Sequence, residues 1–328
     1  MSVLVTGGAG YIGSHTVRAL ERRGYEVIVV DNLSKGHRGS VNKSVFYEGD
    51  IRDKDFLEGV FLKHKITAVI HFAALSLVGE SVKRPDLYFS ANLQGALSLL
   101  DVMNKHDVDQ LVFSSTAAVY GEPSVGPLLE EHPKVPTNPY GESKLFIEKI
   151  LHRHDQAFGI RSISLRYFNA AGADLAGDIG EDHRPETHLI PLILQTALEQ
   201  RREIQIFGTD YPTDDGTCIR DYIHVNDLSD AHILALEALA SGASSNAYNL
   251  GNGKGFSVRE VIATAEKVVG RSIPTQEAPR RAGDPAILVA SSERIQSELN
   301  WEPKLADLKS IIETAWVWHK SHPHGFRK

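Results

Sequence analysis

Tyr140 and Lys144 are the two residues of this sequence best suited to move a proton. They lie four residues apart, directly after Pro139, and in a helix that spacing puts both side chains on one face. A phenol with a pKa near 10 is a poor base at neutral pH, but a neighbouring ammonium favours its phenolate. The pair therefore predicts a catalytic tyrosine with a lysine activator. Taken alone, the same spacing is also typical of an ordinary solvated helix face.

A hydroxyl at the end of a predicted strand completes this catalytic set. Ser114, Ser115 and Thr116 follow the apolar run that we expect to form a strand. In open parallel sheets, the carboxyl ends of the strands form the edge where ligands bind. A Thr116 hydroxyl at that edge is able to hydrogen-bond a substrate oxygen and Tyr140 together, and so to relay a proton. The alternative is a strand-end hydroxyl that satisfies a neighbouring carbonyl.

A glycine-rich turn near the start of the chain is typical of a dinucleotide-binding loop. Gly7, Gly10 and Gly13 recur every three residues between an apolar run and an amphipathic segment. Without a Cβ the turn tightens, the backbone approaches a pyrophosphate, and the helix N-terminus offers N–H groups. Asp31 follows the second predicted strand, where a carboxylate binds an adenosine ribose and repels a 2′-phosphate. We therefore expect NAD rather than NADP, with a plain tight turn as the alternative for the glycines alone.

Two further strand ends supply expected cofactor contacts. Asp50, after the third predicted strand, either caps the helix that follows or hydrogen-bonds the adenine. Phe72, Ala73 and Ala74 close the fourth strand, and the small alanines allow a close approach of the cofactor. Phe72 fits a cofactor contact and core packing equally well. With a dinucleotide bound, Lys144 gains a second role, which is to hold the nicotinamide ribose.

The order of strands and helices predicts an α/β fold that gathers these residues at one sheet edge. Runs that are apolar throughout and separated by helical patterns are typical of a parallel sheet covered on both faces, a Rossmann-type doubly wound domain. The predicted strands are 3–5, 27–30, 45–47, 68–72, 111–114, 163–167, 204–207 and 247–250. The predicted helices are 13–23, 53–64, 85–104, 140–157, 188–200 and 226–240.

We expect two domains, because the texture of the sequence changes after residue 170. Residues 1–170 form the NAD-binding domain, and residues 171–328 form a smaller α/β domain that binds the substrate. The second domain begins with a loop rich in Gly, Asp and Ala, and a long loop runs from about 208 to Asp221. The segment at about 222–250 is also suited to cross back and complete the first sheet.

Composition excludes several classes of protein. The 328 residues include 35 Lys and Arg against 42 Asp and Glu, a net charge of −7, which disfavours nucleic-acid and membrane-surface partners. No apolar run reaches the roughly 18 residues that span a bilayer, and the start of the chain lacks the pattern of a secretory signal. Cys218 is the only cysteine, so we expect a protein of the reducing cytoplasm. We expect no metal, since the chemistry needs none and the clustered histidines, at 152 and 154 and at 319, 322 and 324, lie on a helix or near the terminus.

These motifs together resemble the extended short-chain dehydrogenase/reductase family and, within it, the UDP-glucose 4-epimerases. The resemblance runs almost end to end and includes the tail at 316–326. It is carried by residues 4–15, 31–33, 49–52, 78–81, 139–141, 165–169, 180–182, 210–217 and 220–225. It implies a tightly held NAD that takes the C4′ hydride of a UDP-hexose and returns it to the opposite face of a transient 4′-keto sugar. UDP-glucose and UDP-galactose would interconvert with no net redox change.

The resemblance also assigns roles to matching positions. The implied cofactor contacts are Gly7, Gly10, Tyr11, Ile12, Gly13, Asp31, Asn32, Asp50, Ile51, Phe72, Ala73, Ala74, Asn92, Ser114 and Phe168. The implied catalytic residues are Tyr140, Lys144 and Thr116. The implied substrate contacts are Thr116, Tyr140, Asn169, Leu189, Phe207, Arg220, Arg281, Asp284 and Leu288. Guanidinium forks suit a diphosphate, although Arg220 has the alternative of pairing with Asp221 or Asp227, and Phe207 stacks on uracil or belongs to the core.

Four positions depart from the family's pattern or leave it open. Ser76 stands where well-known members have a lysine that contacts the cofactor, so NAD could be held less tightly. Thr116 replaces the commoner serine, and His188 replaces an asparagine that contacts substrate in some members. Leu288 stands where residue size varies with tolerance of a 2′-N-acetyl group. Its intermediate bulk leaves open a UDP-N-acetylglucosamine 4-epimerase or an enzyme of dual specificity.

Other activities on the same scaffold are weaker alternatives. Sugar-nucleotide dehydratases and decarboxylases carry a carboxylate next to the strand-end hydroxyl, but Ala117 and Ala118 follow Thr116 here. A 4-keto reductase that consumes NADPH is disfavoured by Asp31. A catalytically inactive NAD-sensing regulator would be expected to lack Tyr140 or Lys144.

Two predicted helices carry apolar side chains beyond those the sheet needs, and relatives pair these helices across a two-fold axis. We therefore expect a homodimer. The residues concerned are Leu87, Leu93, Leu97 and Leu100 on helix 85–104, and Leu145, Phe146, Ile150 and Leu151 on helix 140–157.

Overall fold

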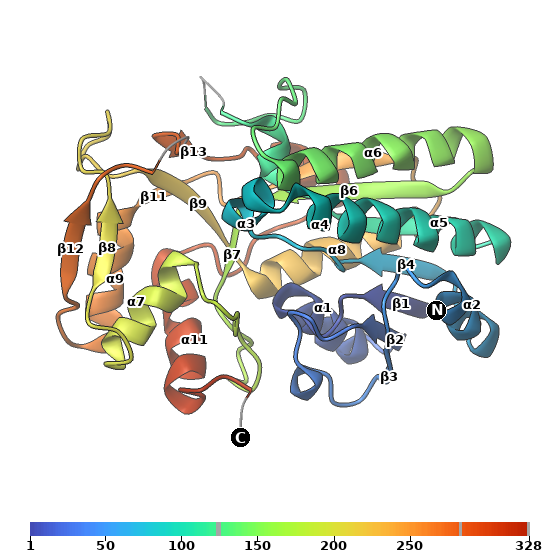
Figure 1. The fold of residues 1–328 in the computed structure, drawn as a ribbon, viewed down its shortest axis with the longest axis horizontal. Helices are drawn as coiled ribbons and strands as arrows, with labels where there is room; N and C mark the ends of the chain where they lie inside the picture. The colour runs from blue at the N-terminus through green and yellow to red at the C-terminus, as the bar shows by residue number, and fades with distance from the viewer. Residues whose placement is uncertain (123–125, 282–283, 327–328) are drawn as a thin grey trace.

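A seven-stranded, entirely parallel sheet forms the larger part of the molecule (Figure 1). The structure is a computed structural model and describes residues 1–122, 126–281 and 284–326. The strand order is β10-β6-β5-β4-β1-β2-β3. The strands are β1 Ser2–Thr6, β2 Glu26–Asp31, β3 Val45–Glu48, β4 Ala68–His71, β5 Gln110–Ser114, β6 Arg161–Tyr167 and β10 Asn246–Leu250. The predicted doubly wound fold is confirmed, and the strand order reverses between β1 and β4.

Helices cover both faces of this sheet, which explains why its strands are apolar throughout. The helices are α1 Tyr11–Arg22, α2 Lys54–Lys63, α3 Val78–Lys83, α4 Pro85–Tyr88, α5 Gly95–Lys105, α6 Pro139–Phe158 and α8 Val225–Ala240. Val3 and Val5 of β1 pack into the core beneath α1 and α8, whereas Leu4 points into the opposite core beneath α2 and α5. Alternate side chains of one strand therefore enter different cores.

The predicted helix 85–104 is not uniform. It consists of α4, a wider π-helical turn at Phe89–Gln94, and α5. Asn92, an expected cofactor contact, lies in the π-helical turn and is fully buried. Such wide turns are uncommon and occur often at functional sites.

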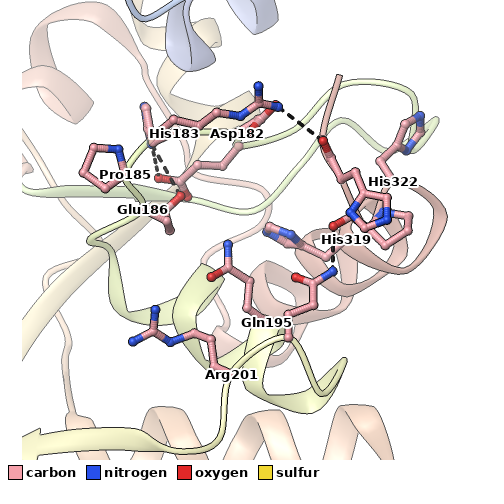
Figure 2. Close-up of a pocket in the computed structure, with 14 residues that line it drawn as sticks. Asp182, His183, Pro185, Glu186, Gln195, Arg201, His319 and His322 are labelled. Atoms are coloured by element: carbon pink, nitrogen blue, oxygen red, sulfur yellow. Dashed lines mark hydrogen bonds and ion pairs between the residues drawn. The ribbon is translucent and has the colours of Figure 1, made fainter. Parts of the chain in front are cut away.

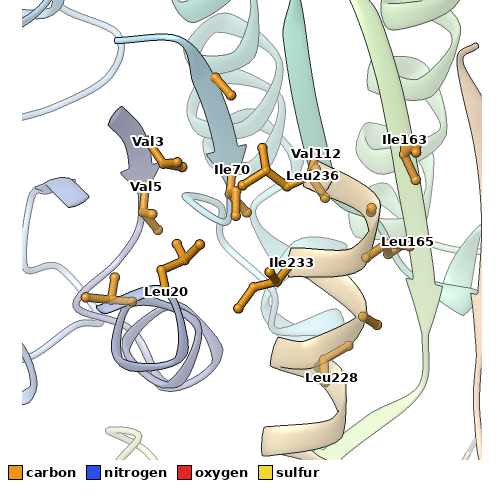
Figure 3. Packing of buried hydrophobic residues seen from close by; sticks show 14 of the residues in the cluster. Val3, Val5, Leu20, Ile70, Val112, Ile163, Leu165, Leu228, Ile233 and Leu236 are labelled. Carbon is orange, nitrogen blue, oxygen red and sulfur yellow. The ribbon is translucent and has the colours of Figure 1, made fainter. Parts of the chain in front are cut away.

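The segment after residue 222 returns to the large sheet. β10 pairs in parallel with β6, so that Tyr248 lies opposite Leu165. Between them in the chain, α8 lies on the sheet beside α1 (Figure 1). Its apolar face packs against β4 and β5, with Leu236 next to Ile70 and Val112 in the close-up of Figure 3. Residues distant in sequence thus share one core.

The remainder of the chain forms smaller sheets and helices around a separate core. The strands are β7 Asn169–Ala171, β8 Ile204–Phe207, β9 Ile219–His224, β11 Gly255–Ser257, β12 Thr275–Ala278 and β13 Ile287–Leu288, and the helices are α7 Leu189–Ala197, α9 Val258–Val269, α10 Glu293–Leu299 and α11 Leu308–Ser321. β9 pairs with β7 and β13 in parallel and with β11 in antiparallel, and β8 pairs with β12. The core between α7, α9 and α11 includes Ile193, Val261 and Ile311.

The expected long loop up to Asp221 is wrong at its C-terminal end. Ile219 already begins β9, whose second and third residues are Arg220 and Asp221. Two adjacent charged residues hide the strand from a search for apolar runs. The strand forms because short segments from three other parts of the chain pair with it.

The helices of the described residues include none that is both long enough and apolar enough to cross a membrane.

The packing of α8 gives a testable prediction about stability. Leu236 is fully buried, so Leu236→Ala should lower the free energy of unfolding by about 2–5 kcal/mol through lost apolar contact and a residual cavity. Leu62 on α2 is 73% exposed, and Leu62→Ala should change stability by less than about 0.5 kcal/mol. Urea unfolding followed by tryptophan fluorescence measures both variants. Equal effects would contradict the packing described for α8.

Candidate active site

The glycine turn between β1 and α1 has no room for side chains. Gly7 has a φ of +73°, and a Cβ on it would lie 2.5 Å from the backbone nitrogen of Ala73. A Cβ on Gly13 would lie 2.2 Å from the carbonyl oxygen of Gly7. Gly10 precedes α1 and caps it with no side chain. The first N–H groups of α1 therefore face the sheet's carboxyl edge without side-chain partners from their own cap, as an anion-binding turn requires.

Asp31, at the end of β2, braces this turn. Its Oδ2 accepts the N–H of Ala9 at 3.0 Å, and its Oδ1 accepts the N–H of Leu33 at 2.8 Å. Burial raises the pKa of Asp31, and these hydrogen bonds oppose the rise. The carboxylate lies between the glycine turn and the loop after β2, next to the position expected for a ribose.

Asp50 does not cap the helix that follows it, which was one of its two predicted roles. Asp53 caps α2 instead, by accepting the N–H of Phe56 at 3.0 Å. Asp50 accepts hydrogen bonds from the Arg52 side chain at 2.9 and 2.7 Å and from Asn32 Nδ2 at 3.2 Å. The hydrogen bonds from Arg52 are the main reason that the pKa of Asp50 falls to about 2. An ionised carboxylate thus stands at the rim beside the end of β2.

The end of β4 is tied to the end of β1 where the strand order reverses. The N–H groups of Phe72 and Ala73 both donate to the carbonyl oxygen of Thr6, at 2.9 and 3.1 Å. Asn92 holds the next loop, because its Oδ1 accepts the N–H of Leu75 at 2.8 Å and its Nδ2 donates to the Leu75 carbonyl at 3.1 Å. The Asn92 amide is therefore engaged with the protein backbone, which shapes the edge of the crevice.

The N-terminal end of α6 carries the proposed catalytic pair. Asn138 caps the helix by accepting the N–H of Gly141 at 2.9 Å, and Tyr140 and Lys144 lie one turn apart. Lys144 is only 3% exposed, and its Nζ donates to the carbonyl oxygen of Ser114 at 2.8 Å. This contact joins α6 to the carboxyl end of β5.

Tyr140 is partly exposed, and its side chain lies close to that of Thr116. Burial raises the pKa of Tyr140, and the Thr116 hydroxyl lowers it in part. The Thr116 Oγ1 also accepts the N–H of Ala118 at 3.1 Å, which leaves its own hydrogen free for the phenol oxygen. The structure thus brings together Tyr140, Thr116 and Lys144, which sequence reasoning grouped.

The electrostatics of Lys144 are unusual for a lysine. Burial lowers the pKa of Lys144 to about 7, although Glu148, one turn further along α6, raises it in part. The Nζ also lies 4.8 Å from the centre of the Phe113 ring. Near neutral pH Lys144 therefore holds its proton only weakly. A negative charge next to the ammonium would stabilise the protonated form.

A buried polar network behind the catalytic pair was missed by sequence reasoning. Arg166 donates to both oxygens of Glu148, at 2.9 and 2.6 Å, and Ser115 Oγ donates to Glu148 Oε1 at 2.6 Å. Arg166 also donates to the hydroxyl of Tyr120 at 2.9 Å. Because Glu148 follows Lys144 by four residues, the same helical spacing that selected the pair could have found it.

The other expected cofactor residues line the same carboxyl edge or pack near it. Tyr11 and Ile12 begin α1, Ile51 is buried behind α5, Ala74 follows β4, Ser114 ends β5 with its hydroxyl 2.5 Å from that of Tyr167, and Phe168 follows β6. The Phe72 ring lies 4.6 Å from the ring of His232 in α8. That contact favours the core-packing alternative for Phe72.

The expected substrate residues come from the smaller sheets and the loops around them. Asn169 begins β7, and its Nδ2 donates to the carbonyl oxygen of Asp221 at 2.9 Å. Leu189 is the first residue of α7. The Arg281 guanidinium lies 4.0 Å from the centre of the Phe207 ring, so these two predicted contacts form one stacked unit.

The alternative partners considered for Arg220 are wrong. Its guanidinium pairs with Asp284, another expected substrate residue, and it also donates to the Ile219 carbonyl oxygen at 2.7 Å. Asp221 instead accepts backbone N–H groups, among them that of Asn252 at 2.9 Å. Asp227 likewise accepts backbone N–H groups, from residues 304 and 305. Leu288, in β13, lies opposite Arg220 in the ladder.

A second cluster of titratable side chains lies in the loop before α7. Glu181, His183, Glu186 and His188 approach one another closely. The first three line a hollow of about 680 Å³, in which Figure 2 labels His183 and Glu186. Burial lowers the pKa of His183, but its contacts with the two carboxylates outweigh this and raise the pKa to about 9. Only His188 was singled out from the sequence, and there as a departure from the family's pattern. The alternation of Glu and His over eight residues was the signal available.

Doubly wound sheets with a glycine turn at the strand reversal define a class of dinucleotide-binding proteins, and this molecule has that architecture. The model of the NAD dependent epimerase/dehydratase family matches residues 3–251, and the chain belongs to this family.

Several known proteins similar to this chain are named UDP-glucose 4-epimerase. A UDP-glucose 4-epimerase of Halalkalibacterium halodurans is 59% identical over 99% of this chain and 98% of its own length. A crystal structure of a UDP-glucose 4-epimerase covers all of both chains with a TM-score of 0.99 and 55% identity. The enzyme of Bifidobacterium longum, solved in complex with NAD+ and UDP, has a TM-score of 0.93 and 41% identity over 99% of this chain and 100% of its own.

The buried ammonium gives a pH-dependent prediction for the ligand-free protein. Burial lowers the pKa of native Lys144 to about 7, whereas the pKa of an unfolded lysine is about 10.4. Between these values the unfolded state binds one more proton, so this group makes the protein more stable as the pH rises. The stability of the unmodified chain relative to Lys144→Met should therefore increase by about 1.4 kcal/mol per pH unit. Urea unfolding at pH 7 and pH 9 measures it, and an unchanged difference would refute the shift.

Proposed function

We propose that this protein interconverts UDP-glucose and UDP-galactose by epimerisation at C4′, with a tightly bound NAD. The observation that carries the proposal is the meeting of Tyr140, Thr116 and buried Lys144 at the sheet edge that also holds the glycine turn. Full-length relatives at up to 59% identity that bear the name of this enzyme support it.

The residues present fit NAD. Gly7 and Gly13 lie too close to neighbouring backbone for any side chain, which keeps the turn tight, and the start of α1 offers N–H groups to a pyrophosphate. Asp31 lies beside this turn, where its charge favours a ribose with free hydroxyls over a 2′-phosphate. Asn32, Asp50 and Ile51 would border the adenosine half, and Lys144 would hold the nicotinamide ribose.

Proton transfer falls to Tyr140. When bound, NAD supplies a hydride acceptor that becomes the donor on return. Tyr140 takes the proton of the sugar 4′-hydroxyl, and the Thr116 hydrogen and the Lys144 ammonium stabilise the phenolate. The weakly held proton of Lys144 matters here, because a neighbouring phenolate at Tyr140 raises the affinity of Lys144 for its proton.

Substrate binding separates the part that is gripped from the part that reacts. Arg220 and Arg281 would hold the diphosphate, and Phe207 would stack on uracil. Asn169, Leu189, Asp284 and Leu288 would complete the uridine and hexose surroundings. Binding energy from the nucleotide leaves the 4′-keto sugar free to turn and present its other face.

The alternatives differ at single positions. The size of Leu288 does not decide whether UDP-N-acetylhexosamines are accepted. Their acceptance would make the protein a UDP-N-acetylglucosamine 4-epimerase or an enzyme of dual specificity. Dehydration or decarboxylation lacks the neighbouring acid, because Ala117 and Ala118 follow Thr116. An inactive NAD-sensing regulator would not need the contacts that Tyr140 and Lys144 make.

Removing one hydroxyl tests the function. Tyr140→Phe should lower the rate of UDP-galactose conversion by about 10²–10⁴-fold, as expected for loss of an acid–base group, with UDP binding retained. Tyr25→Phe is the matched control, because the Tyr25 hydroxyl reaches Glu237 on α8 and should leave the rate unchanged. Chromatographic separation of the two nucleotide sugars follows UDP-glucose formation without added NAD, and UDP-N-acetylgalactosamine is tested alongside. Full activity of Tyr140→Phe would exclude the mechanism.

The division of labour along the chain is part of the proposal. Residues 1–170, with the returning segment at about 222–250, would bind NAD, and the rest of 171–328 would bind the UDP-sugar. Cys218 is free and buried, which suits the reducing cytoplasm. The net charge of −7 argues against nucleic-acid and membrane partners.

We also propose a homodimer built on α4, α5 and α6. Leu87, Leu97 and Phe146 are 37%, 41% and 43% exposed. The predicted apolar surface was partly wrong, because Leu100, Leu145 and Leu151 are buried in the chain's own core. The residues that remain outside are those able to meet a second copy.

Light scattering tests the dimer. The expected mass is twice the 36.1 kDa of one chain, and the double variant Leu97→Glu, Phe146→Glu should shift it to that of a monomer, because charges would be buried at the interface. Leu62→Glu, at an exposed position of α2, is the control and should keep the dimer mass. A monomeric unmodified chain would overturn the proposal.

A further inference from the structure

Four side chains with metal-binding atoms converge on one point that the proposed reaction does not use. Glu181, His183, Glu186 and His188 each offer one ligand atom, and all of these atoms lie within 4.8 Å of one another. They come from a single stretch of the loop between β7 and α7. Figure 2 shows His183 and Glu186 pointing toward each other beside the hollow.

The two imidazoles are aimed at the same oxygen. His183 Nδ1 and His188 Nδ1 lie 3.0 and 2.9 Å from Oε1 of Glu181. His188 Nδ1 lies 2.8 Å from Oε1 of Glu186, and His183 Nδ1 lies 3.7 Å from its Oε2. A tetrahedral ion with ligand distances of about 2.0–2.2 Å separates its ligands by about 3.3–3.6 Å. These four separations bracket that range, and any pair as far apart as the 4.8 Å limit of the cluster would have to close by about 1 Å to seat an ion.

Charge and burial point in the same direction. Glu181 is 4% exposed, and a buried carboxylate requires a compensating charge. Two protonated imidazoles would supply it, and so would one divalent cation bound by neutral rings. Two nitrogens and two carboxylate oxygens suit Zn²⁺ and related transition-metal ions better than Mg²⁺ or Ca²⁺, which prefer oxygen alone.

We propose that Glu181, His183, Glu186 and His188 bind one divalent transition-metal ion, with Zn²⁺ as the best match. This departs from the expectation of no metal made from the sequence. Four protein ligands close the coordination shell, which is the pattern of a structural site and not of a catalytic one. The proposal is independent of the epimerase activity.

The location shows what such an ion would hold together. His188 is the residue before α7, and Leu189 after it is an expected substrate contact. The ring of Tyr11, the first residue of α1, lies 6.1 Å from that of His183, and its hydroxyl donates to the carbonyl oxygen of Gly172 at 2.7 Å. The ion would therefore fix the loop before α7 against the helix of the glycine turn. The hollow beside the cluster gives an entry path.

The neighbouring C-terminal histidines do not join the cluster. His322 stacks on Trp318 with ring centres 3.9 Å apart, and its Nδ1 lies 2.9 Å from Ser321 Oγ. His322 and His324 line the same hollow, so they are suitable controls for adventitious binding by surface imidazoles.

Metal titration of the full chain tests the site. Protein treated with a chelator and dialysed should bind one equivalent of Zn²⁺ per chain, and its Tm should rise on binding, because a ligand that binds only the native state stabilises it. Co²⁺ in place of Zn²⁺ should give the intense visible absorption of a four-coordinate ion. The double variant His183→Gln, His188→Gln should bind Zn²⁺ at least about 100-fold more weakly and lose the Co²⁺ spectrum. If the double variant fails to fold, Glu186→Gln replaces it in the test. Glutamine is close in size to the natural residue, and this variant should also bind Zn²⁺ more weakly.

Two outcomes would overturn the proposal. Stoichiometric binding that survives in the double variant but disappears in His322→Gln, His324→Gln would assign the metal to the surface. No binding, with an unchanged Tm, at tenfold excess of Zn²⁺ would mean that the four side chains form ion pairs only. Retention of the full Zn²⁺ affinity and Co²⁺ spectrum in His322→Gln, His324→Gln, together with their loss in the double variant, would establish the site.

Discussion

The hydrogen bond from the buried Lys144 ammonium to the carbonyl oxygen of Ser114 holds the active edge together. It joins the start of α6 to the end of β5 and so places Tyr140 beside Thr116. An ammonium loses hydration when it is buried, and one carbonyl with a nearby aromatic ring offsets only part of that loss. The pKa of Lys144 falls to about 7 for this reason. A phenolate at Tyr140 would supply the missing negative charge. It would thereby offset the desolvation cost of the buried ammonium while Tyr140 is deprotonated.

The polar residues along the crevice divide into contacts and braces. The side-chain amide of Asn92 makes its hydrogen bonds within the protein, with the Leu75 backbone and with the Ser143 hydroxyl. Asp31 likewise holds the N–H of Ala9 in the glycine turn. The backbone of Gly7 lies so close to that of Ala73 that a Cβ would not fit between them. The turn therefore needs support that keeps its backbone in place. Residues expected to touch a cofactor therefore also fix the backbone that would receive it.

The expected substrate residues come from short pieces far apart in the chain. β9 brings Arg220 next to Leu288 of β13, while β7 places Asn169 against the Asp221 carbonyl. Asp284 forms an ion pair with Arg220, and the Arg281 guanidinium stacks on the Phe207 ring. Each arginine thus has a partner that a diphosphate or a base could displace. An arrangement that exchanges internal pairs for ligand contacts suits a site that binds and releases a charged nucleotide.

Sequence patterns alone predict the parallel sheet, the glycine turn, the acidic end of β2 and the helix that carries Tyr140 and Lys144. These features depend on local patterns: apolar runs, missing Cβ atoms and a four-residue helical step. The three-dimensional fold was needed to show that Arg220 pairs with Asp284, that β9 is a strand, and that Leu100, Leu145 and Leu151 face inward. The same holds for the Glu181 and His188 contact. Such pairings arise when segments with no periodic signature pack together, and their energy belongs to the whole fold and not to any short stretch of chain.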